Sequence, residues 1–227
     1  NLNSKIIKLL SHRQFGIGFD QLLIIESSLN PKAEFKYRIF NADGNEVEQC
    51  GNGARCFYRY IKNNNISKNS KITVETKSGL IILSEPSKNL ISVDMGKPVF
   101  QDKISELFTY VSIGNPHAVL KPLGQDEKWE GAIELGKKIQ TNNVLFPNGV
   151  NIGIMKIIDD NNLRLKVLER GSGITLACGS GACAATVTAI RKGLVKTPVK
   201  VHMDGGNLII DWDGLNSIIM SGPAKII

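Results

Sequence analysis

The chain has 227 residues, 42% of them hydrophobic, and a formal net charge of +7. No apolar run approaches the roughly 18 residues that a membrane span needs, and the first residues show no signal-peptide pattern, which predicts a soluble, cytoplasmic protein without membrane contact. The lysines are scattered among asparagines and isoleucines, without a dense basic block. This pattern indicates a solvated surface and argues against a nucleic-acid partner.

The first half of the chain predicts a helix, two strands, a second helix, a hairpin and a further strand. Apolar residues at helical spacing indicate the helices, β-rich runs indicate the strands, and glycine or asparagine marks the turns. The expected elements are an amphipathic helix at 3–12, strands at 21–26 and 35–40, a turn at 41–44, a helix from Cys50 to about Ile61, a hairpin over 72–83 and a strand from 91, with the half ending near Phe100.

The second half follows a predicted linker over residues 101–108 and repeats much of this order. The expected elements are short strands at 110–113 and 118–120 on either side of Gly114-Asn115-Pro116-His117, a helix at 129–139, strands at 151–158 and 163–169, a helix from Cys178 to about Lys192 that Gly193 ends, and a hairpin over 199–210. Many strands and one central helix in each half predict a sheet wrapped around that helix.

A cysteine–glycine motif occurs twice and contains all four cysteines. The copies are Cys50-Gly51-Asn52-Gly53-Ala54-Arg55-Cys56 and Cys178-Gly179-Ser180-Gly181-Ala182-Cys183. The leading cysteines lie 128 positions apart, the turn glycines Gly79 and Gly206 lie 127 apart, and Gly96 and Gly222 lie 126 apart. Recurrence of three features in one order predicts a duplicated unit; chance likeness of glycine-rich turns is the alternative.

The position of Cys50 and Cys178 just before a helix predicts reactive thiols. The first backbone N–H groups of a helix have no intrahelical partner, and the helix dipole adds partial positive charge there. Both effects lower the pKa of a thiol, and the same N–H groups can hold a carboxylate. Two such thiols on opposite faces of one molecule suit inversion at a carbon, because one removes a proton while the other delivers one.

Three other interpretations of the cysteines stay open. The first is a zinc site, which the five-residue gap inside the first motif disfavours. The second is a redox disulfide between Cys50 and Cys178. The third is a buried structural thiol, the interpretation we favour for Cys56 and Cys183, which lie one turn into each helix.

At these residues the chain resembles the diaminopimelate epimerases, amino-acid epimerases that use no pyridoxal phosphate. The resemblance covers nearly the whole chain and rests mainly on the two cysteine motifs. Other matching segments are Gly16–Gln21, Arg38–Gly44 running into Gln49-Cys50, Gly114–His117, Val150-Asn151, Glu169-Arg170-Gly171 and Ala177–Cys183.

The resemblance implies a role for each matching residue. Cys50 and Cys178 would be the acid–base pair, without cofactor or metal. Gly51, Asn52, Gly179 and Ser180 would bind the carboxylate at the reacting carbon. The remaining residues expected to hold the substrate are Gln21, Asn41, Asn115, Asn151, Glu169 and Arg170, with His117 and Glu169 setting the environment of the thiols.

Several of these residues also have ordinary structural interpretations. Asn41 and Asn151 flank turns, where asparagine is common for backbone reasons. Pro116-His117 could be a turn with a surface histidine, and Glu169-Arg170 a solvated pair at a strand end. Rival functions are a racemase for another amino acid such as proline, a non-catalytic binding domain, and a thiol redox protein.

The resemblance implies an α+β fold of two pseudo-symmetric domains, 1–108 with Cys50 and 109–227 with Cys178. Each would wrap a mixed or antiparallel sheet around a central helix, with diaminopimelate as the small-molecule substrate and a homodimer as the possible assembly. The family begins with a strand and a Gly-x-Gly-Asn-Asp-Phe segment that this chain does not contain. We therefore expect an open sheet edge and an activity that is in question.

Overall fold

The structure is a computed structural model that describes residues 2–47, 50–101 and 105–226. The chain forms two compact units, Asn1–Val93 with Pro223–Ile227, and Asp94–Gly222. These units differ from the predicted halves of 1–108 and 109–227 at two places. Val99–Gln101 belongs with the second unit because it pairs with the strand Phe108–Ser112, and the last residues belong with the first.

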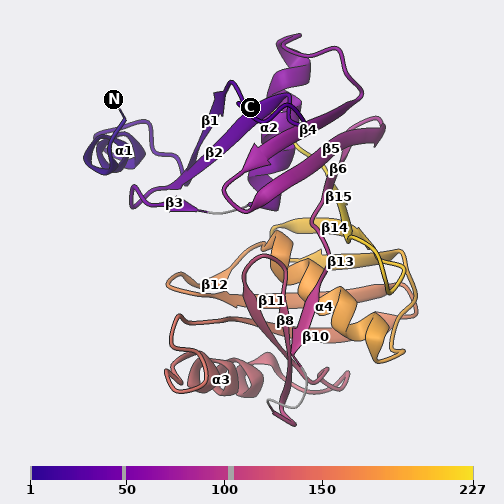
Figure 1. The fold of residues 1–227 in the computed structure, drawn as a ribbon. Helices are drawn as coiled ribbons and strands as arrows, with labels where there is room; N and C mark the ends of the chain where they lie inside the picture. Colours follow the sequence, from indigo (N-terminus) through magenta and orange to yellow (C-terminus); the bar gives the residue numbers. More distant parts are fainter. Residues whose placement is uncertain (1, 48–49, 102–104, 227) are drawn as a thin grey trace. The chain divides into compact units, whose positions relative to one another are not determined.

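The first unit consists of a five-strand sheet with one short additional strand and two helices (Figure 1). Its sheet order is β1-β2-β4-β5-β6, with β3 on β2; β2 and β4 are parallel and the other pairs that we describe are antiparallel. The elements are α1 (Ser4–Ser11), β1 (Gln21–Glu26), β2 (Phe35–Asn41), β3 (Glu46–Val47), α2 (Gly51–Asn63), β4 (Lys71–Thr76), β5 (Gly79–Ser87) and β6 (Leu90–Asp94).

The second unit has the sheet order β7-β8-β9-β10-β11-β13-β14-β15, with β12 on β11. The pairs β9–β10 and β11–β13 are parallel and the others antiparallel. The elements are β7 (Val99–Gln101), β8 (Phe108–Ser112), β9 (Pro116–Leu120), α3 (Trp129–Gln140), β10 (Asn151–Asp159), β11 (Asn162–Glu169), β12 (Gly173–Thr175), α4 (Gly179–Arg191), β13 (Val199–Met203), β14 (Gly206–Asp211) and β15 (Ile219–Gly222).

The order of elements repeats between the two units. Strands β1 to β6 follow each other in the same order and pairing as β10 to β15, and α2 and α4 stand at the same place in that order. The strand register identifies equivalent residues in the two units. Phe35 of β2 pairs with Val74 of β4, and Leu163 of β11 pairs in the same way with Val201 of β13. Tyr37 is thus equivalent to Leu165. The α+β fold class is confirmed.

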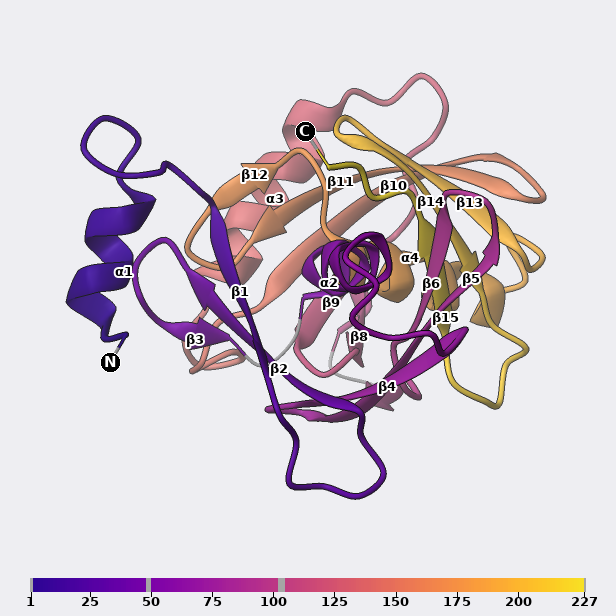
Figure 2. The same ribbon diagram turned by 90° about the horizontal axis from the view of Figure 1, so that it is seen from above.

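Each unit places one helix against a curved sheet. Figure 2 looks down α2, with β1, β2, β4, β5 and β6 around it. In the second unit α4 contacts β8, β9, β10, β11, β13 and β14. Gly181 of α4 lies against Val167, whereas Gly136 of α3 lies against Leu168. Neighbouring residues of a strand point to opposite faces, so α3 and α4 cover opposite faces of this sheet.

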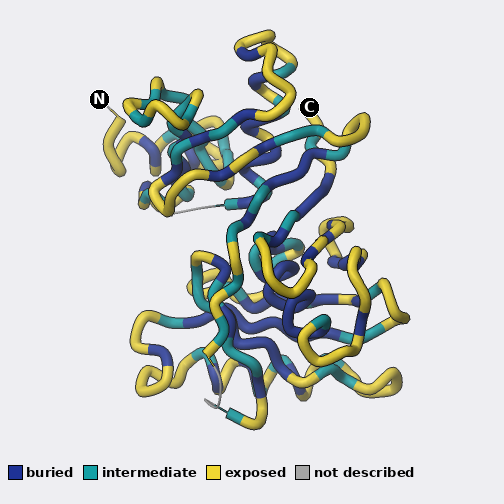
Figure 3. Tube along the Cα trace, turned by 45° about the vertical axis from the view of Figure 1, so that its right-hand side comes forward, coloured by how far each residue is buried: buried dark blue, intermediate teal, exposed yellow. Residues whose placement is uncertain are grey.

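The central strands of the second unit are buried, as their dark colour in Figure 3 shows, and their buried residues lie on both faces of the sheet. α4 is buried along nearly its whole length, and most of its residues are small: glycine, alanine, serine, threonine, cysteine and valine. Under α3 the core is aromatic and aliphatic: Phe108 and Phe146 have ring centroids 5.7 Å apart, and Ile152 and Ile154 are fully buried.

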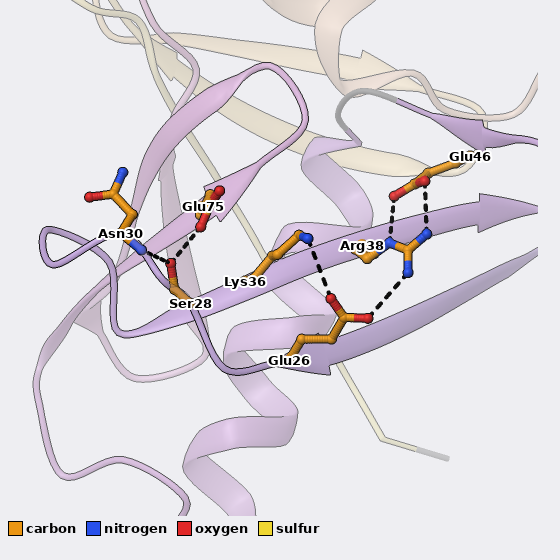
Figure 4. A network of polar contacts seen from close by, with 7 residues as sticks. All are labelled: Glu26, Ser28, Asn30, Lys36, Arg38, Glu46 and Glu75. Atoms are coloured by element: carbon orange, nitrogen blue, oxygen red, sulfur yellow. Dashed lines mark hydrogen bonds and ion pairs between the residues drawn. The ribbon is translucent and has the colours of Figure 1, made fainter. Parts of the chain in front are cut away.

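An ion-pair network on the outer face of β1 and β2 fixes the strand that precedes Cys50. Arg38 of β2 bonds both carboxylate oxygens of Glu46 on β3, at 2.7 and 2.9 Å, and Glu26 of β1 at 3.2 Å (Figure 4). Arg38 holds the pKa of the Glu46 carboxyl below its usual range. A bidentate pair of this kind adds directional specificity, so β3 is held on β2 just ahead of α2.

Cys183 is fully buried, as predicted, but the prediction for Cys56 is wrong because Cys56 is exposed. Counting from the start of each helix, Cys56 is equivalent to Ala184, which is fully buried. In the second unit α4 is covered by β8 and β9. Among the residues that the structure describes, the first unit has no equivalent pair, so β1 is an edge strand and this side of α2 is open.

Candidate active site

The start of α2 presents the first cysteine. Cys50 is the N-cap residue, with extended backbone angles, and its Sγ accepts a hydrogen bond from the Gly53 N–H at 3.5 Å. The first intrahelical bond runs from the Ala54 N–H to the Cys50 carbonyl. The N–H groups of Gly51 and Asn52 therefore have no carbonyl four residues earlier within the helix. These groups form an anion-binding position at the helix N-terminus.

Two amide side chains of the sheet are hydrogen-bonded to each other, and one of them reaches this helix start. Gln21 begins β1 and Asn41 ends β2, and the two are register partners. The Gln21 Nε2 donates to the Asn41 Oδ1 at 3.1 Å. The Gln21 Oε1 lies 3.6 Å from the point that a Cβ on Gly53 would occupy. The structure thus brings Gln21 to α2 from a place 29 residues before Cys50.

The start of α4 presents the second cysteine in the same way. Cys178 is again an extended N-cap residue, and the Ala182 N–H donates to its carbonyl at 2.9 Å. Its side chain is more enclosed than that of Cys50: Cys178 is only 6% exposed, whereas Cys50 is half-buried. A Cβ on Gly181 would lie 3.3 Å from the Cys178 Sγ and 2.8 Å from Val167. A side chain at position 181 would therefore displace the thiol or the strand.

Three polar residues form a hydrogen-bonded chain beside Cys178. The His117 Nε2 lies 3.0 Å from both the Asn115 Oδ1 and the Ser180 Oγ. The Asn115 Nδ2 donates to the Ser180 Oγ at 3.2 Å, and this hydroxyl lies 3.7 Å from the Cys178 Sγ. An amide oxygen only accepts, so Nε2 carries the proton of the neutral imidazole. With Ser180 accepting from Asn115, its own proton can point at the sulfur.

Burial governs the protonation of His117. The residue is fully buried, and desolvation lowers its pKa to about 3, because a charged imidazolium loses its hydration there. His117 is therefore neutral at physiological pH. Its other ring nitrogen, Nδ1, is buried and has no hydrogen-bond partner among the described residues.

Burial also decides the protonation of Cys178. Desolvation, followed by the charge of Glu169, raises the pKa of the Cys178 thiol to about 12. The nearby Gly181 N–H and Ser180 hydroxyl lower this pKa, but their effects are smaller. The helix start therefore acts in the predicted direction, but burial outweighs it, so the expectation of a lowered pKa for this thiol is wrong for the resting structure. A thiol this deep keeps its proton unless a ligand changes its surroundings.

The end of β11 brings in the charged pair of the site. Glu169 accepts a hydrogen bond from the Thr175 hydroxyl at 2.6 Å. The Arg170 N–H donates to the Asn151 Oδ1 at 2.9 Å, and the Arg170 guanidinium bonds the Asn148 carbonyl. Glu169 is the last residue of β11, and Asn41 is the last residue of the equivalent strand β2. The matching registers make these two residues equivalent in the repeat.

Comparison with known proteins decides the family. A sequence profile described as diaminopimelate epimerase matches residues 1–101 and 109–227. The chain belongs to the diaminopimelate epimerase family. It is 46% identical to the diaminopimelate epimerase of Nitrosomonas eutropha, over 98% of this chain and 86% of that protein. It is 42% identical to the diaminopimelate epimerase of a Psychrobacter species, over 100% of this chain and 84% of that protein.

Solved structures share the fold of this family member. A hydroxyproline epimerase from Agrobacterium vitis superposes with a TM-score of 0.72 at 14% identity, over 96% of this chain and 77% of that one. A phenazine biosynthesis protein from Bacillus anthracis superposes with a TM-score of 0.66 at 15% identity, over 98% and 86%. At such identities these superpositions report on the fold alone.

The predicted site residues of this family member fall into two clusters, one in each unit. The first contains Gln21, Asn41, Cys50, Gly51 and Asn52, and the second contains Asn115, His117, Asn151, Glu169, Arg170, Cys178, Gly179 and Ser180. In the second cluster the side chains of Asn115, His117 and Ser180 meet directly, whereas Arg170 is exposed.

Sequence reasoning missed two residues of the second cluster. Thr175 anchors Glu169, and Gly181 leaves the space that the Cys178 thiol occupies. Gly181 lies inside the repeated motif, so its match with Gly53 could have indicated it. Thr175 gave no such signal, because its partner is set by the β11–β12 pairing.

Two further observations concern membranes and metals. Within residues 2–47, 50–101 and 105–226, no helix is both long and apolar enough to cross a bilayer. Over the same residues, no group of three or more histidine, cysteine or acidic side chains could hold a metal ion together. All four cysteines are free thiols.

Proposed function

We propose that this chain interconverts LL- and meso-diaminopimelate without a cofactor, with Cys50 and Cys178 as the two acid–base groups. One thiolate takes the proton from Cα and becomes a thiol, which leaves a carbanion. The other thiol gives its proton to the opposite face of that carbon and becomes a thiolate. The observation that carries this proposal is that two cysteines cap two helices at equivalent places of a repeat.

The helix starts are suited to stabilise the carbanion. Its negative charge spreads onto the carboxylate at the reacting carbon, and backbone N–H groups fixed in advance bind such charge well. Gly51 and Asn52 offer these groups on α2, and Gly179 and Ser180 offer them on α4. The glycines allow a carboxylate to come close to the backbone.

The surroundings of Cys178 support a role as the proton donor of the resting enzyme. Its raised pKa keeps the thiol protonated. When the reaction runs in the other direction, Cys178 must be the base, and the Ser180 hydroxyl, held by Asn115 and His117, is placed to stabilise its thiolate. Neutral His117 holds these hydrogen-bonded side chains in place without adding a charge beside Cys178.

The remaining residues are proposed to hold the substrate. Arg170 offers a planar fork for the distal carboxylate, and Glu169 can accept bonds from an ammonium. Asn41, Asn115, Asn151 and Gln21 supply neutral donors and acceptors. Recognition of both ends of diaminopimelate distinguishes this proposal from a proline-type racemase, whose substrate has no distal amino-acid group.

Deuterium wash-in tests this function. The chain, reduced and shown to be folded, is incubated with LL-diaminopimelate in D₂O, and Cα exchange and the meso product are followed by proton NMR and mass spectrometry. We expect exchange together with meso product. L-Proline, incubated in parallel, should neither exchange nor racemise. Exchange of proline, or no exchange of either compound, would contradict the proposal.

The cellular setting belongs to the same proposal. We predict that the protein is a cytoplasmic homodimer that binds neither nucleic acid nor membranes. We also predict that it acts in lysine and cell-wall biosynthesis. The resemblance supports the dimer and the pathway, and the composition supports the location.

A further inference from the structure

A buried tyrosine hydroxyl lies under the start of α2. Tyr37 of β2 is 1% exposed, and its ring packs on Phe57 with centroids 4.6 Å apart. Its hydroxyl is fully buried and has no hydrogen-bond partner among the described residues. A Cβ on Gly53 would lie 2.4 Å from this oxygen. The hydroxyl thus lies directly against the first turn of α2, whose Gly53 N–H bonds the Cys50 sulfur.

The repeat shows that the hydroxyl is not needed to build the core. The equivalent residue of the second unit is Leu165, which is also 1% exposed. Leucine fills this place without a polar atom. An unpaired buried hydroxyl destabilises a fold, and none of the described residues pairs with this one. Its presence in only one unit therefore points to a partner that the resting structure does not supply.

We propose that Tyr37 is a positioning residue for Cys50, its hydroxyl donating a hydrogen bond to the sulfur when that thiol is ionised. The inference rests on the proposed function, in which Cys50 becomes a thiolate in each catalytic cycle. The helix N–H groups are themselves donors, so they cannot accept the Tyr37 proton. Acceptors at this helix start include the Cys50 sulfur, the Gln21 Oε1 and the Asn52 Oδ1, which is itself buried and unpaired among the described residues. Of these three, only the sulfur gains a negative charge.

The chemistry of Tyr37 fits a donor that keeps its proton. Burial is the largest cause that raises the pKa of Tyr37, followed by Cys50 and Cys56. The phenol therefore stays protonated while the thiol beside it ionises. Hydrogen bonds to charged groups are stronger than neutral ones, so the bond forms when the thiolate forms and favours it.

Other charged groups near α2 are held by partners of their own. Arg55 of α2 bonds the carbonyls of Gly51 and Pro223. On the neighbouring strands the charges form ion pairs, namely Glu26 with Lys36 and Arg38, Glu46 with Arg38, and Glu85 with Arg59. Cys56, one turn further along α2, interacts electrostatically with both Cys50 and Tyr37.

The test is a pH titration of Cys50 reactivity in the full chain with Tyr37→Phe. This change removes only the hydroxyl and keeps the ring that packs on Phe57. Iodoacetamide labelling is followed by peptide mass spectrometry across the range in which thiols ionise. Trypsin cuts after Arg55, so Cys50 and Cys56 fall on separate peptides. Tyr58→Phe is the matched control, because Tyr58 is as buried but its hydroxyl donates to the Ser70 carbonyl.

We expect Tyr37→Phe to slow the labelling of Cys50 by roughly 10- to 100-fold at a fixed pH at which the thiol is only partly ionised, the size of a lost hydrogen bond to a charged group. The titration in Tyr58→Phe should match that of the unaltered chain. An unchanged Cys50 titration in Tyr37→Phe would overturn the inference. The hydroxyl would then be a hydrogen-bond donor to Gln21 or have a purely structural role.

Turnover separates this inference from the proposed function. In the epimerisation assay Tyr37→Phe should lose about 10- to 100-fold in kcat/KM in both directions, because the substitution cannot change the equilibrium between the two isomers. If the unaltered chain fails to epimerise while the Cys50 titration still shifts, the proposed function fails and the hydrogen bond stands. If the chain epimerises and Tyr37→Phe changes neither rate nor titration, only the inference fails.

Discussion

At the scale of single residues, two opposing effects act on the Cys178 thiol. Its helix N–H groups and the Ser180 hydroxyl favour the thiolate, whereas burial and the carboxylate of Glu169 favour the thiol. Burial wins because a charge in a low-dielectric interior loses most of its hydration. A position at a helix start is therefore not sufficient to make a cysteine acidic.

Glu169→Gln should lower the pKa of the Cys178 thiol. The change removes the negative charge near the sulfur while keeping an oxygen that can accept the bond from Thr175. A shift of about one unit is expected from the loss of one nearby like charge, measured as the pH dependence of Cys178 alkylation. Glu134→Gln, on the exposed face of α3, should leave this profile unchanged. An unaltered profile in Glu169→Gln would mean that burial alone sets the Cys178 pKa.

His117 should make the stability of the protein depend on pH. Its pKa is about 3 in the folded chain and about 6.5 when unfolded, so the unfolded state binds the extra proton between these values. The stability is fully present above the unfolded pKa and falls by about 1.4 kcal/mol per pH unit as the pH drops toward the folded value.

Chemical denaturation of the unaltered chain and of His117→Gln at several pH values measures this effect. The difference in stability between the two proteins should shrink as the pH is lowered from neutral, because only the unaltered chain loses the histidine contribution. A difference that is constant with pH would contradict a neutral buried His117.

At the scale of elements, the two central helices end in the same way. The residue after each C-cap is left-handed, Asn65 with φ of 53° and Gly193 with φ of 69°. In each case the next N–H bonds a carbonyl five residues earlier, from Ile66 to Ile61 and from Leu194 to Ala189. This Schellman arrangement satisfies carbonyls that the helix leaves open.

Gly193→Ala should destabilise the protein by about 1 kcal/mol, because alanine is strained at a positive φ. Gly131→Ala is the matched control, since a Cβ at either position meets no atom within 4 Å. Gly131 lies inside α3, where alanine stabilises by roughly 0.5–1 kcal/mol. Thermal unfolding of both variants should show opposite shifts; shifts of equal sign would show that backbone strain at Gly193 is negligible.

At the scale of the whole molecule, the proposed two-base reaction would use one cysteine from each unit. Cys50→Ala and Cys178→Ala should each abolish epimerisation, because inversion needs a base on one face of Cα and an acid on the other. Cys56→Ala is the control, an exposed cysteine of the same helix that should leave the rate unchanged. The assay is conversion of LL- to meso-diaminopimelate with circular dichroism as a check of folding. Near-normal turnover in either variant would rule out the two-base assignment.

The sequence predicted the long elements closely because their signals are local. Helices expected from Cys50 and Cys178 begin directly after those residues, and most expected strands form within two residues of their predicted ends. The short strands β3, β7 and β12 escaped prediction. Two or three residues show no periodicity, and these strands exist because a neighbour offers an edge.

The sequence by itself determined the repeat, the two helix-capping cysteines and the family, because motif spacing and backbone caps depend on residues close together in the chain. Only the tertiary structure decided that Cys56 is exposed while Cys183 is buried, and that Cys178 keeps its proton. It also decided that the Tyr37 hydroxyl, under α2, has no hydrogen-bond partner among the described residues. Burial and electrostatics depend on which strands cover a side chain, and those strands come from distant parts of the sequence.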